Sequence, residues 1–219
     1  MSDDLRGLVE GFRATTTASV ADAVDRVVRA PGFMTHEIKP IAPAKLVGPA
    51  VTVLEAAAFD AGPPQHALEA IDAAAPGAVL VIGMADPDAS RNVAHFGGLM
   101  ATAAVTRGLA GAVLDAGCRD VEEIRGLGFA VFSRTVVPST TVGRFRTVDR
   151  DLPVVCGGVL VRPGDLLVGD ADGVVVVPRE AAAEVLRVAA EIEATERRMT
   201  EAIRRTGSIL KAMEEFARI

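Results

Sequence analysis

The chain has 219 residues, of which 50% are hydrophobic, and a formal net charge of −6. That length supports one sizeable core better than two independent ones. The acidic balance disfavours nucleic acid as a partner, because phosphate binding needs clustered Lys and Arg. No apolar run approaches the roughly 18 residues that a membrane span requires, and the chain starts without the basic segment of a secretory signal. We therefore expect a cytoplasmic protein without a membrane partner.

Cysteine usage fits that compartment. Cys118 and Cys156 are too few for a disulfide framework in a chain of this size, so we expect both as reduced thiols. Neither belongs to a CxxC pair, and the three histidines are scattered along the chain, which argues against a structural zinc site.

The predicted elements begin with two helices. Apolar spacing indicates a short helix over 5–12 and a second one that starts near Thr15 to Thr17, where a hydroxyl can cap the free amides. Proline and glycine residues between 31 and 49 then predict a long irregular connection.

From residue 50 to residue 134, strands alternate with helices. We expect strands over 50–57, 78–84, 111–115 and 129–134, and helices over 66–74, 98–106 and 121–127. This alternation is typical of parallel βαβ units and predicts an α/β fold. Short β runs between Pro153 and Val177 should pair differently and complete a layered or barrel-like body, with a type I′ hairpin turn from Asp170 to Gly173.

The C-terminal segment has a helical pattern. We predict one long helix over 179–205, a break at Gly207 and a final short helix over 209–216. The chain is thus divided into an α/β domain over 1–178 and a C-terminal helical extension over 179–219. Apolar residues recur at helical spacing along the long helix, so one face must pack on the same domain or on a neighbouring subunit.

A candidate site lies where three predicted parallel strands end. In open α/β sheets, ligands collect at the carboxyl ends of the strands, here 84–88, 115–120 and 133–138. Gly97-Gly98 opens a helix whose free N–H groups face that crevice, and glycine lets a substrate carboxylate approach them. The planar guanidinium of Arg119 can donate hydrogen bonds to a carboxylate or keto oxygen, and the carboxylate of Asp120 can bind a divalent metal through oxygen.

Each of these residues also has a simpler role. Asp120 can cap the helix that follows it, with Glu123 as the capping-box partner. Arg119 can be a surface residue or part of an ion pair, and Gly97-Gly98 can be a tight loop. Their convergence at one predicted crevice favours a small-molecule site.

Three sequence motifs carry a specific resemblance. They are GLAGAVLDAGCRD at 108–120, CGGV at 156–159 followed by PGD at 163–165, and DADGVVVVP at 170–178. Together they resemble the RraA-like family, which includes the 4-hydroxy-4-methyl-2-oxoglutarate aldolases and the regulator of ribonuclease activity A. The likeness covers most of residues 15–180.

The resemblance implies a layered α/β sandwich of the swivelling phosphohistidine-domain type, assembled as a homotrimer or homohexamer. It also implies a divalent metal cofactor, Mg or Mn, bound by Asp120. Arg119 and Asp120 would be the catalytic residues. A pyruvate-like moiety would be held by Arg119 together with Gly97, Gly98, Leu99 and Met100.

The implied activity is that of a class II pyruvate aldolase, a lyase. It would cleave a 4-hydroxy-2-oxo acid, such as 4-hydroxy-4-methyl-2-oxoglutarate, to pyruvate in a metal-dependent retro-aldol reaction, and oxaloacetate decarboxylation would use the same electron sink. The metal and Arg119 would stabilise the enolate. A Schiff-base mechanism is disfavoured because the three lysines, Lys39, Lys45 and Lys211, lie outside the central motif.

One residue departs from the family pattern. Aldolase-competent members tend to carry, at the position of Gly98, an acidic residue that helps a water act as general base, and such help is typically worth about 10²- to 10⁴-fold. We therefore expect metal and pyruvate binding to persist, with weak or redirected aldolase activity and a bias toward decarboxylation. Nearby substitutes for the base, each with an easier structural role, are Asp86, Asp88, His95 and Asp115.

Two other functions stay open. The resemblance to the regulator allows a non-catalytic protein that inhibits a ribonuclease. The glycine at position 98 allows a catalytically inactive trimer with a pyruvate-sensing or structural role.

Overall fold

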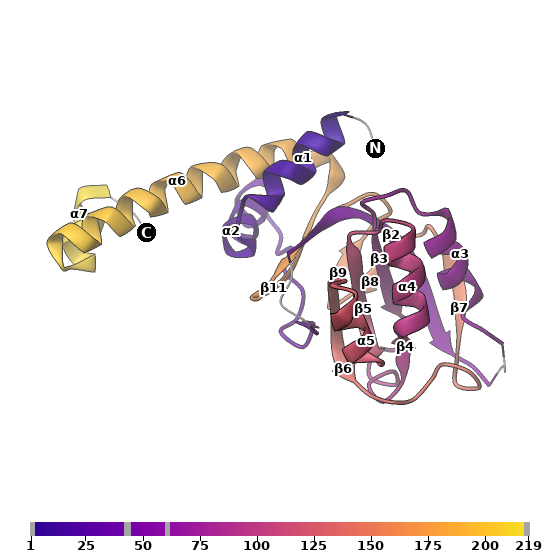
Figure 1. The fold of residues 1–219 in the computed structure, drawn as a ribbon. Coiled ribbons are helices and arrows are strands. Elements are labelled where there is room, and N and C mark those ends of the chain that lie inside the picture. Colours follow the sequence, from indigo (N-terminus) through magenta and orange to yellow (C-terminus); the bar gives the residue numbers. More distant parts are fainter. Residues whose placement is uncertain (1–2, 42–44, 60–61, 217–219) are drawn as a thin grey trace.

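The computed structural model describes residues 3–41, 45–59 and 62–216. A nine-stranded mixed sheet forms the body of the protein, and helices cover it (Figure 1). Its main path runs in the order β1-β6-β5-β3-β2-β10-β11, while β4 pairs with β5 and β7 pairs with β2. A separate hairpin is formed by β8 and β9.

The sheet strands are β1 (Lys39–Pro40), β2 (Leu46–Ala57), β3 (Val79–Met84), β4 (Ala94–Phe96), β5 (Gly111–Cys118), β6 (Val131–Val136), β7 (Phe145–Arg150), β10 (Leu166–Asp170) and β11 (Gly173–Val177). The hairpin strands are β8 (Val154–Cys156) and β9 (Val159–Val161). The helices are α1 (Asp3–Arg13), α2 (Thr17–Val28), α3 (Gln65–Ala73), α4 (Gly98–Thr106), α5 (Val121–Gly126), the 3₁₀ helix η1 (Arg179–Ala181), α6 (Ala182–Thr206) and α7 (Ile209–Phe216).

Parallel pairing of β2, β3, β5 and β6 forms the centre of the sheet. Helices α3, α4 and α5 connect these strands, so the predicted βαβ units and the mixed α/β fold are confirmed. Antiparallel strands extend the sheet on both halves of β2, with β10 on the first half and β7 on the second. The swivelling phosphohistidine-domain type stays a prediction.

Strand β2 starts inside the segment for which the sequence predicted an irregular connection. Its residues 46–49 pair with β10, and Ala50 begins the parallel pairing with β3. Pro49 lacks a backbone N–H and stands where the strand changes partners, a place that tolerates the missing donor. Strands β4 and β7 were not predicted, because the first has only three residues and the second is largely polar.

The hairpin between β10 and β11 corrects a second expectation. Asp170 pairs with Gly173, which leaves a two-residue loop as predicted. A type I′ turn requires positive φ at both loop residues. Neither Ala171 nor Asp172 has it, and Gly173 carries the positive φ of 147° instead. The hairpin is therefore confirmed and the predicted turn type is wrong.

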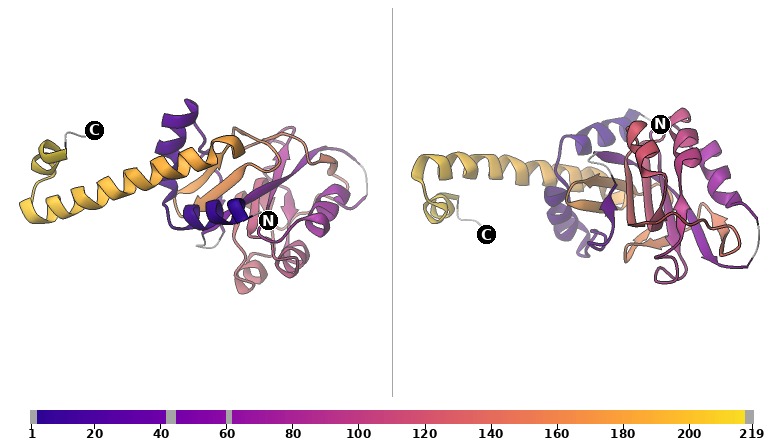
Figure 2. Two further views of the ribbon diagram at one scale, coloured as in Figure 1. Left: turned by 90° about the horizontal axis from the view of Figure 1, so that it is seen from above. Right: turned by 60° about the horizontal axis from the view of Figure 1, so that its bottom comes forward.

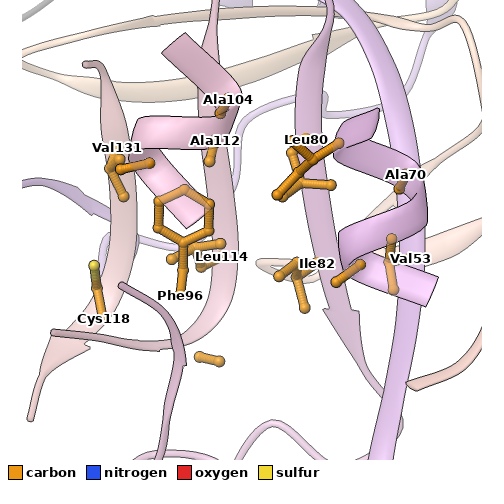
Figure 3. Close-up of a cluster of buried hydrophobic side chains, with 14 of the residues drawn as sticks. Val53, Ala70, Leu80, Ile82, Phe96, Ala104, Ala112, Leu114, Cys118 and Val131 are labelled. Carbon is orange, nitrogen blue, oxygen red and sulfur yellow. The ribbon is translucent and has the colours of Figure 1, made fainter. Parts of the chain in front are cut away.

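The two faces of the central sheet have different covers. Helices α3, α4 and α5 lie over one face, and Leu80, Phe96 and Leu114 point into the layer between them (Figure 3). On the other face, the hairpin side chains Val154, Cys156 and Val161 belong to the cluster that includes Val81 and Phe132 of the sheet. Both cysteines are free, as expected, and both are buried.

The C-terminal helices begin against the body and then leave it. The first turns of α6 pack on α1 and α2, and the rest of α6 projects away, with α7 at its far end (Figures 1 and 2). The long helix is confirmed, preceded by η1 and ended at Gly207, whose φ is 66°. Its apolar face packs first on its own chain, through Val185, Ala189 and Ile192. The domain boundary at 178 stays a prediction.

In the described part of the chain, no helix has both the length and the apolar character needed to cross a bilayer.

A core truncation tests this packing. Replacing Leu80, which is fully buried, with Ala should lower the free energy of unfolding by about 2–5 kcal/mol through lost burial and a residual cavity. The matched control is Leu210→Ala on α7, where the side chain is 67% exposed and the change should stay within about 0.5 kcal/mol. Urea unfolding curves give both values, and equal losses would contradict the assigned core.

Candidate functional site

A cavity of about 240 Å³ opens where the end of β4, the end of β5 and the start of α4 meet. Its other walls come from the start of α3 and from residues 140–142. All six residues predicted to bind substrate or metal line this cavity: Gly97, Gly98, Leu99, Met100, Arg119 and Asp120. The other two strand ends that we expected at the crevice, 84–88 and 133–138, do not line it. The structure therefore brings together side chains that stand about twenty residues apart in the chain.

The path of the chain after β5 positions Arg119 and Asp120. The Arg119 amide donates to the Phe96 carbonyl at 3.0 Å, which holds the end of β5 beside β4. Asp120 then adopts a left-handed backbone with φ of 56°, a conformation that Asp tolerates better than most residues. Helix α5 follows directly.

Gly97 leaves the space that these two side chains occupy. A Cβ atom at this position would lie 2.7 Å from Asp120 Oδ2 and 3.2 Å from Arg119 Nε. The φ of Gly97 is −155°, which any residue can adopt, so a side chain here would disturb the positions of Arg119 and Asp120 and not the backbone. The pair Gly97-Gly98 is thus more than a tight loop.

The Asp120 carboxylate binds the start of α4. Its Oδ2 accepts a hydrogen bond from the Gly98 amide at 3.0 Å and lies 3.5 Å from Arg119 Nε. Asp120 occupies the N-cap position of α5, as predicted, but no side-chain cap hydrogen bond joins it to that helix, so the capping-box alternative is wrong. We expected the first N–H group of α4 to face the crevice without a partner. Instead, it donates to the Asp120 carboxylate.

Charge and exposure at the site suit a small anionic ligand. The side chains of Arg119 and Asp120 are 42% and 44% exposed, so solvent and ligands reach both. Arg119 Nη1 also lies 3.5 Å from the Ser139 carbonyl, a long contact that helps to orient the guanidinium. Arg119 is therefore both an ion-pair partner and an accessible cation.

The donor set determines what kind of metal the site can hold. No group of three or more His, Cys, Asp or Glu side chains suited to a metal is found within 3–41, 45–59 and 62–216. Magnesium often binds through one or two carboxylates and keeps several waters. The accessible carboxylate of Asp120, with Oδ2 held by the Gly98 amide, fits such a hydrated ion.

A buried pair behind the cavity was not predicted from the sequence. His95 Nδ1 lies 2.6 Å from Glu55 Oε2, and both side chains are fully buried. Phe145 packs edge-on against the His95 ring, with centroids 4.7 Å apart. No local sequence pattern signals this pair, because Glu55 of β2 and His95 of β4 are brought together only by the tertiary structure. His95 is thus a packed core residue at the cavity wall, which agrees with the structural role that we considered simpler than that of a base.

The other three candidate bases have structural roles. Asp115 is fully buried and pairs with Arg134 Nε at 2.5 Å. Asp86 accepts the amides of Asp88 and Ala89 in a turn, and Asp88 pairs with Arg91. None of the three aspartates lines the cavity.

Comparison with known proteins identifies the family. A family model described as Aldolase/RraA matches residues 17–176, and the chain belongs to this RraA-like family. A protein of Halalkalibacterium halodurans named "Putative 4-hydroxy-4-methyl-2-oxoglutarate aldolase" is 36% identical over 209 residues, which cover 92% of this chain and 93% of that protein.

Solved structures agree with this assignment. An uncharacterized protein from Pseudomonas syringae pv. tomato matches with a TM-score of 0.84 and 29% identity, over 96% of this chain and 94% of that one. RraAS2 of Streptomyces coelicolor, described as an unusual member of the RNase ES inhibitor RraA protein family, matches with a TM-score of 0.80 and 25% identity, over 90% and 96% of the two chains.

Removing one partner of the buried pair should destabilise the protein. Glu55→Ala leaves His95 buried without its partner and should cost about 3–5 kcal/mol of unfolding free energy. Glu69→Ala is the matched control, since it breaks a partly exposed carboxylate–histidine pair with His66 and should change stability little. Thermal or urea unfolding of both variants measures the difference, and a small loss for Glu55→Ala would contradict the paired, buried geometry.

Proposed function

We propose that this protein is a divalent-metal-dependent lyase that acts on 2-oxo acids and releases pyruvate. The observation that carries the proposal is the meeting of Arg119 and Asp120 with the first residues of α4 at one open cavity. The curated relative from Halalkalibacterium halodurans, which matches along nearly the whole chain, supports an aldolase.

The start of α4 provides a binding surface for a carboxylate. The first N–H groups of a helix have no partner within it, and the intrahelical bonds of α4 begin with Ala101, whose amide donates to the Gly97 carbonyl. Asp120 uses the Gly98 amide, so Leu99 and Met100 keep free amides for the substrate carboxylate. Arg119 would add charge-assisted hydrogen bonds to the carboxylate or the keto oxygen.

Asp120 is the residue that would hold Mg or Mn. When bound, the metal would polarise the keto group and stabilise an enolate. Arg119 lies beside that position, and its guanidinium would stabilise the same negative charge as it develops on the keto oxygen. The cavity walls also include the apolar side chains of Leu68 and Val142.

Two reactions share this arrangement. Retro-aldol cleavage of a 4-hydroxy-2-oxo acid and decarboxylation of oxaloacetate both leave the enolate of pyruvate, and only the first requires a base to deprotonate a hydroxyl group. Gly98 has no side chain to provide that base. The proposed function therefore includes decarboxylation, while cleavage depends on a carboxylate from another element.

A conservative change at Asp120 tests the proposal. Asp120→Asn keeps a residue that tolerates the left-handed backbone but removes the charge, so Mn²⁺ affinity should fall at least about tenfold and turnover about 10²-fold or more. The control is Asp151→Asn, because Asp151 also has a left-handed backbone, with φ of 58°, and also pairs with a neighbouring arginine. Calorimetry with Mn²⁺ and steady-state assays with oxaloacetate supply the readouts. Unchanged Mn²⁺ affinity and unchanged oxaloacetate turnover in Asp120→Asn would contradict the proposal.

The likeness to RraAS2 supports a second candidate function, a non-catalytic protein that inhibits a ribonuclease. A near-stoichiometric complex with a ribonuclease, combined with no metal-dependent turnover, would favour it. The same assays would identify an inactive, pyruvate-binding trimer by ligand binding without turnover. Assembly as a homotrimer or homohexamer is part of the proposal, and sedimentation analysis of the purified protein tests it.

A further inference from the structure

The cavity has a second kind of wall, which comes from the α3 side and from the segment before β7. Pro63, Pro64 and Leu68 line the cavity on the α3 side, and Val142 lines it from the segment before β7. Leu99 adds another large apolar side chain at the start of α4. One cavity therefore joins the charged groups of the proposed site to an apolar wall.

The large apolar side chains of this wall are exposed to solvent. Leu99 is 87% exposed, Val142 43% and Leu68 37%. A single exposed apolar side chain is common on protein surfaces and needs no explanation. Several of them around one cavity are typical of a binding surface, because contact with a ligand removes them from water.

The α3 side of the wall offers no free N–H group to an anion. Pro63 and Pro64 have no N–H group, and the amides in the first turn of α3 all have partners. Those partners are the carbonyls of the two prolines for Gln65, Ala67 and Leu68, and Thr147 Oγ1 for His66. A helix start binds anions through free amides. The start of α3 therefore provides no second carboxylate site, in contrast to the start of α4.

Positive charge is confined to one end of the cavity. Among the described residues that line it, Arg119 is the one basic residue with an exposed side chain, because His95 is fully buried with Glu55. Arg144 donates through Nη1 to the Thr140 carbonyl at 3.1 Å but does not line the cavity. A carboxylate against the apolar wall would lose hydration without gaining a partner, whereas an alkyl group gains by leaving water.

We infer that this cavity selects 2-oxo acids with an uncharged, apolar tail beyond C4, an inference that rests on the proposed function. The 2-oxo acid head would bind at Arg119 and Asp120. The tail would contact Leu68, Leu99 and Val142. The compound in the name of the Halalkalibacterium halodurans relative, 4-hydroxy-4-methyl-2-oxoglutarate, differs because it carries a second carboxylate in place of such a tail.

Cleavage of such an acid is balanced within the substrate itself. The C3–C4 bond breaks, and its electron pair stays on C3 as the enolate of pyruvate. The C4 hydroxyl loses its proton and becomes the carbonyl of an apolar aldehyde or ketone. Protonation of C3 completes pyruvate, so no other reactant is required.

A neighbouring copy of the chain is another occupant that an exposed apolar surface can have. We assign this surface to the substrate tail because it is continuous, within one cavity, with the exposed pair Arg119 and Asp120. A ligand whose head binds this pair has its tail within reach of the wall.

The test compares how the full chain binds two 2-oxo acids of similar size and shape. 5-Methyl-2-oxohexanoate has an isopropyl group where 2-oxoglutarate has its distal carboxylate, and neither has the C4 hydroxyl that cleavage requires. In calorimetry at saturating Mn²⁺, the first should bind at least about tenfold more tightly. 2-Oxopentanoate should bind about two- to fourfold more tightly than 2-oxobutyrate, because it adds one methylene group to the contact.

A cation on the wall should shift this preference. Leu68→Lys should change the affinity ratio of the two acids at least about tenfold in favour of 2-oxoglutarate. Pyruvate has no tail, so its affinity should stay within about twofold, since an exposed charge away from the head is screened. The matched control is Val105→Lys on α4, because Val105 is 38% exposed but lies outside the cavity. Val142→Thr is a milder second variant that should weaken the binding of 5-methyl-2-oxohexanoate alone.

Three results would overturn the inference, and they differ in what else they change. A wild-type preference for 2-oxoglutarate would show that the distal carboxylate has a partner, and loss of that preference in Arg144→Ala would identify it; the proposed function would stand. An unchanged affinity ratio in Leu68→Lys, together with altered sedimentation, would assign the wall to contact between copies. A wild-type protein that binds neither pyruvate nor the longer 2-oxo acids, and has no metal-dependent turnover, would contradict the proposed function as well.

Discussion

The start of α4 shapes the site in this chain, because two consecutive glycines leave room there for charged side chains. Gly97 gives room to Arg119 and Asp120, and Gly98 gives room to Glu123. A helix start without side chains can therefore be approached by three charged groups from β5 and α5. Because the Gly98 amide binds the Asp120 carboxylate, the two segments are also joined by a hydrogen bond to a charged acceptor, which is stronger than a neutral one.

The sheet supplies the rigidity that such a site needs. Strand β5 is buried along its whole length. β3 pairs with its first half, as far as Leu114, and β6 pairs with it as far as Cys118, next to Arg119. Strand β4 adds a third contact at the end of β5 and leads directly into Gly97. Functional side chains placed at the ends of buried strands are held more precisely than side chains on long loops.

Much of the fold could be predicted from the sequence, because the central strands and helices have strong local patterns. Strand β3 and helix α4 have nearly the predicted bounds, and the βαβ alternation made the parallel order predictable. Strands β4 and β7 and the early start of β2 could not be predicted, because they are stabilised by pairing with distant strands and not by their own composition. The candidate site residues were found because glycine, arginine and aspartate stand at predicted strand and helix ends.

The sequence by itself determined the family, the α/β class and the two segments that carry the candidate site residues, 97–100 and 119–120, since motif and periodicity are local properties of the chain. Only the tertiary structure decided how those residues are used. It turned Asp120 toward α4 and away from its own helix, placed the Glu123 carboxylate over Gly98, and buried His95 against Glu55. Each of these outcomes depends on the direction of a side chain between two elements that are far apart in sequence, and no local pattern encodes that direction.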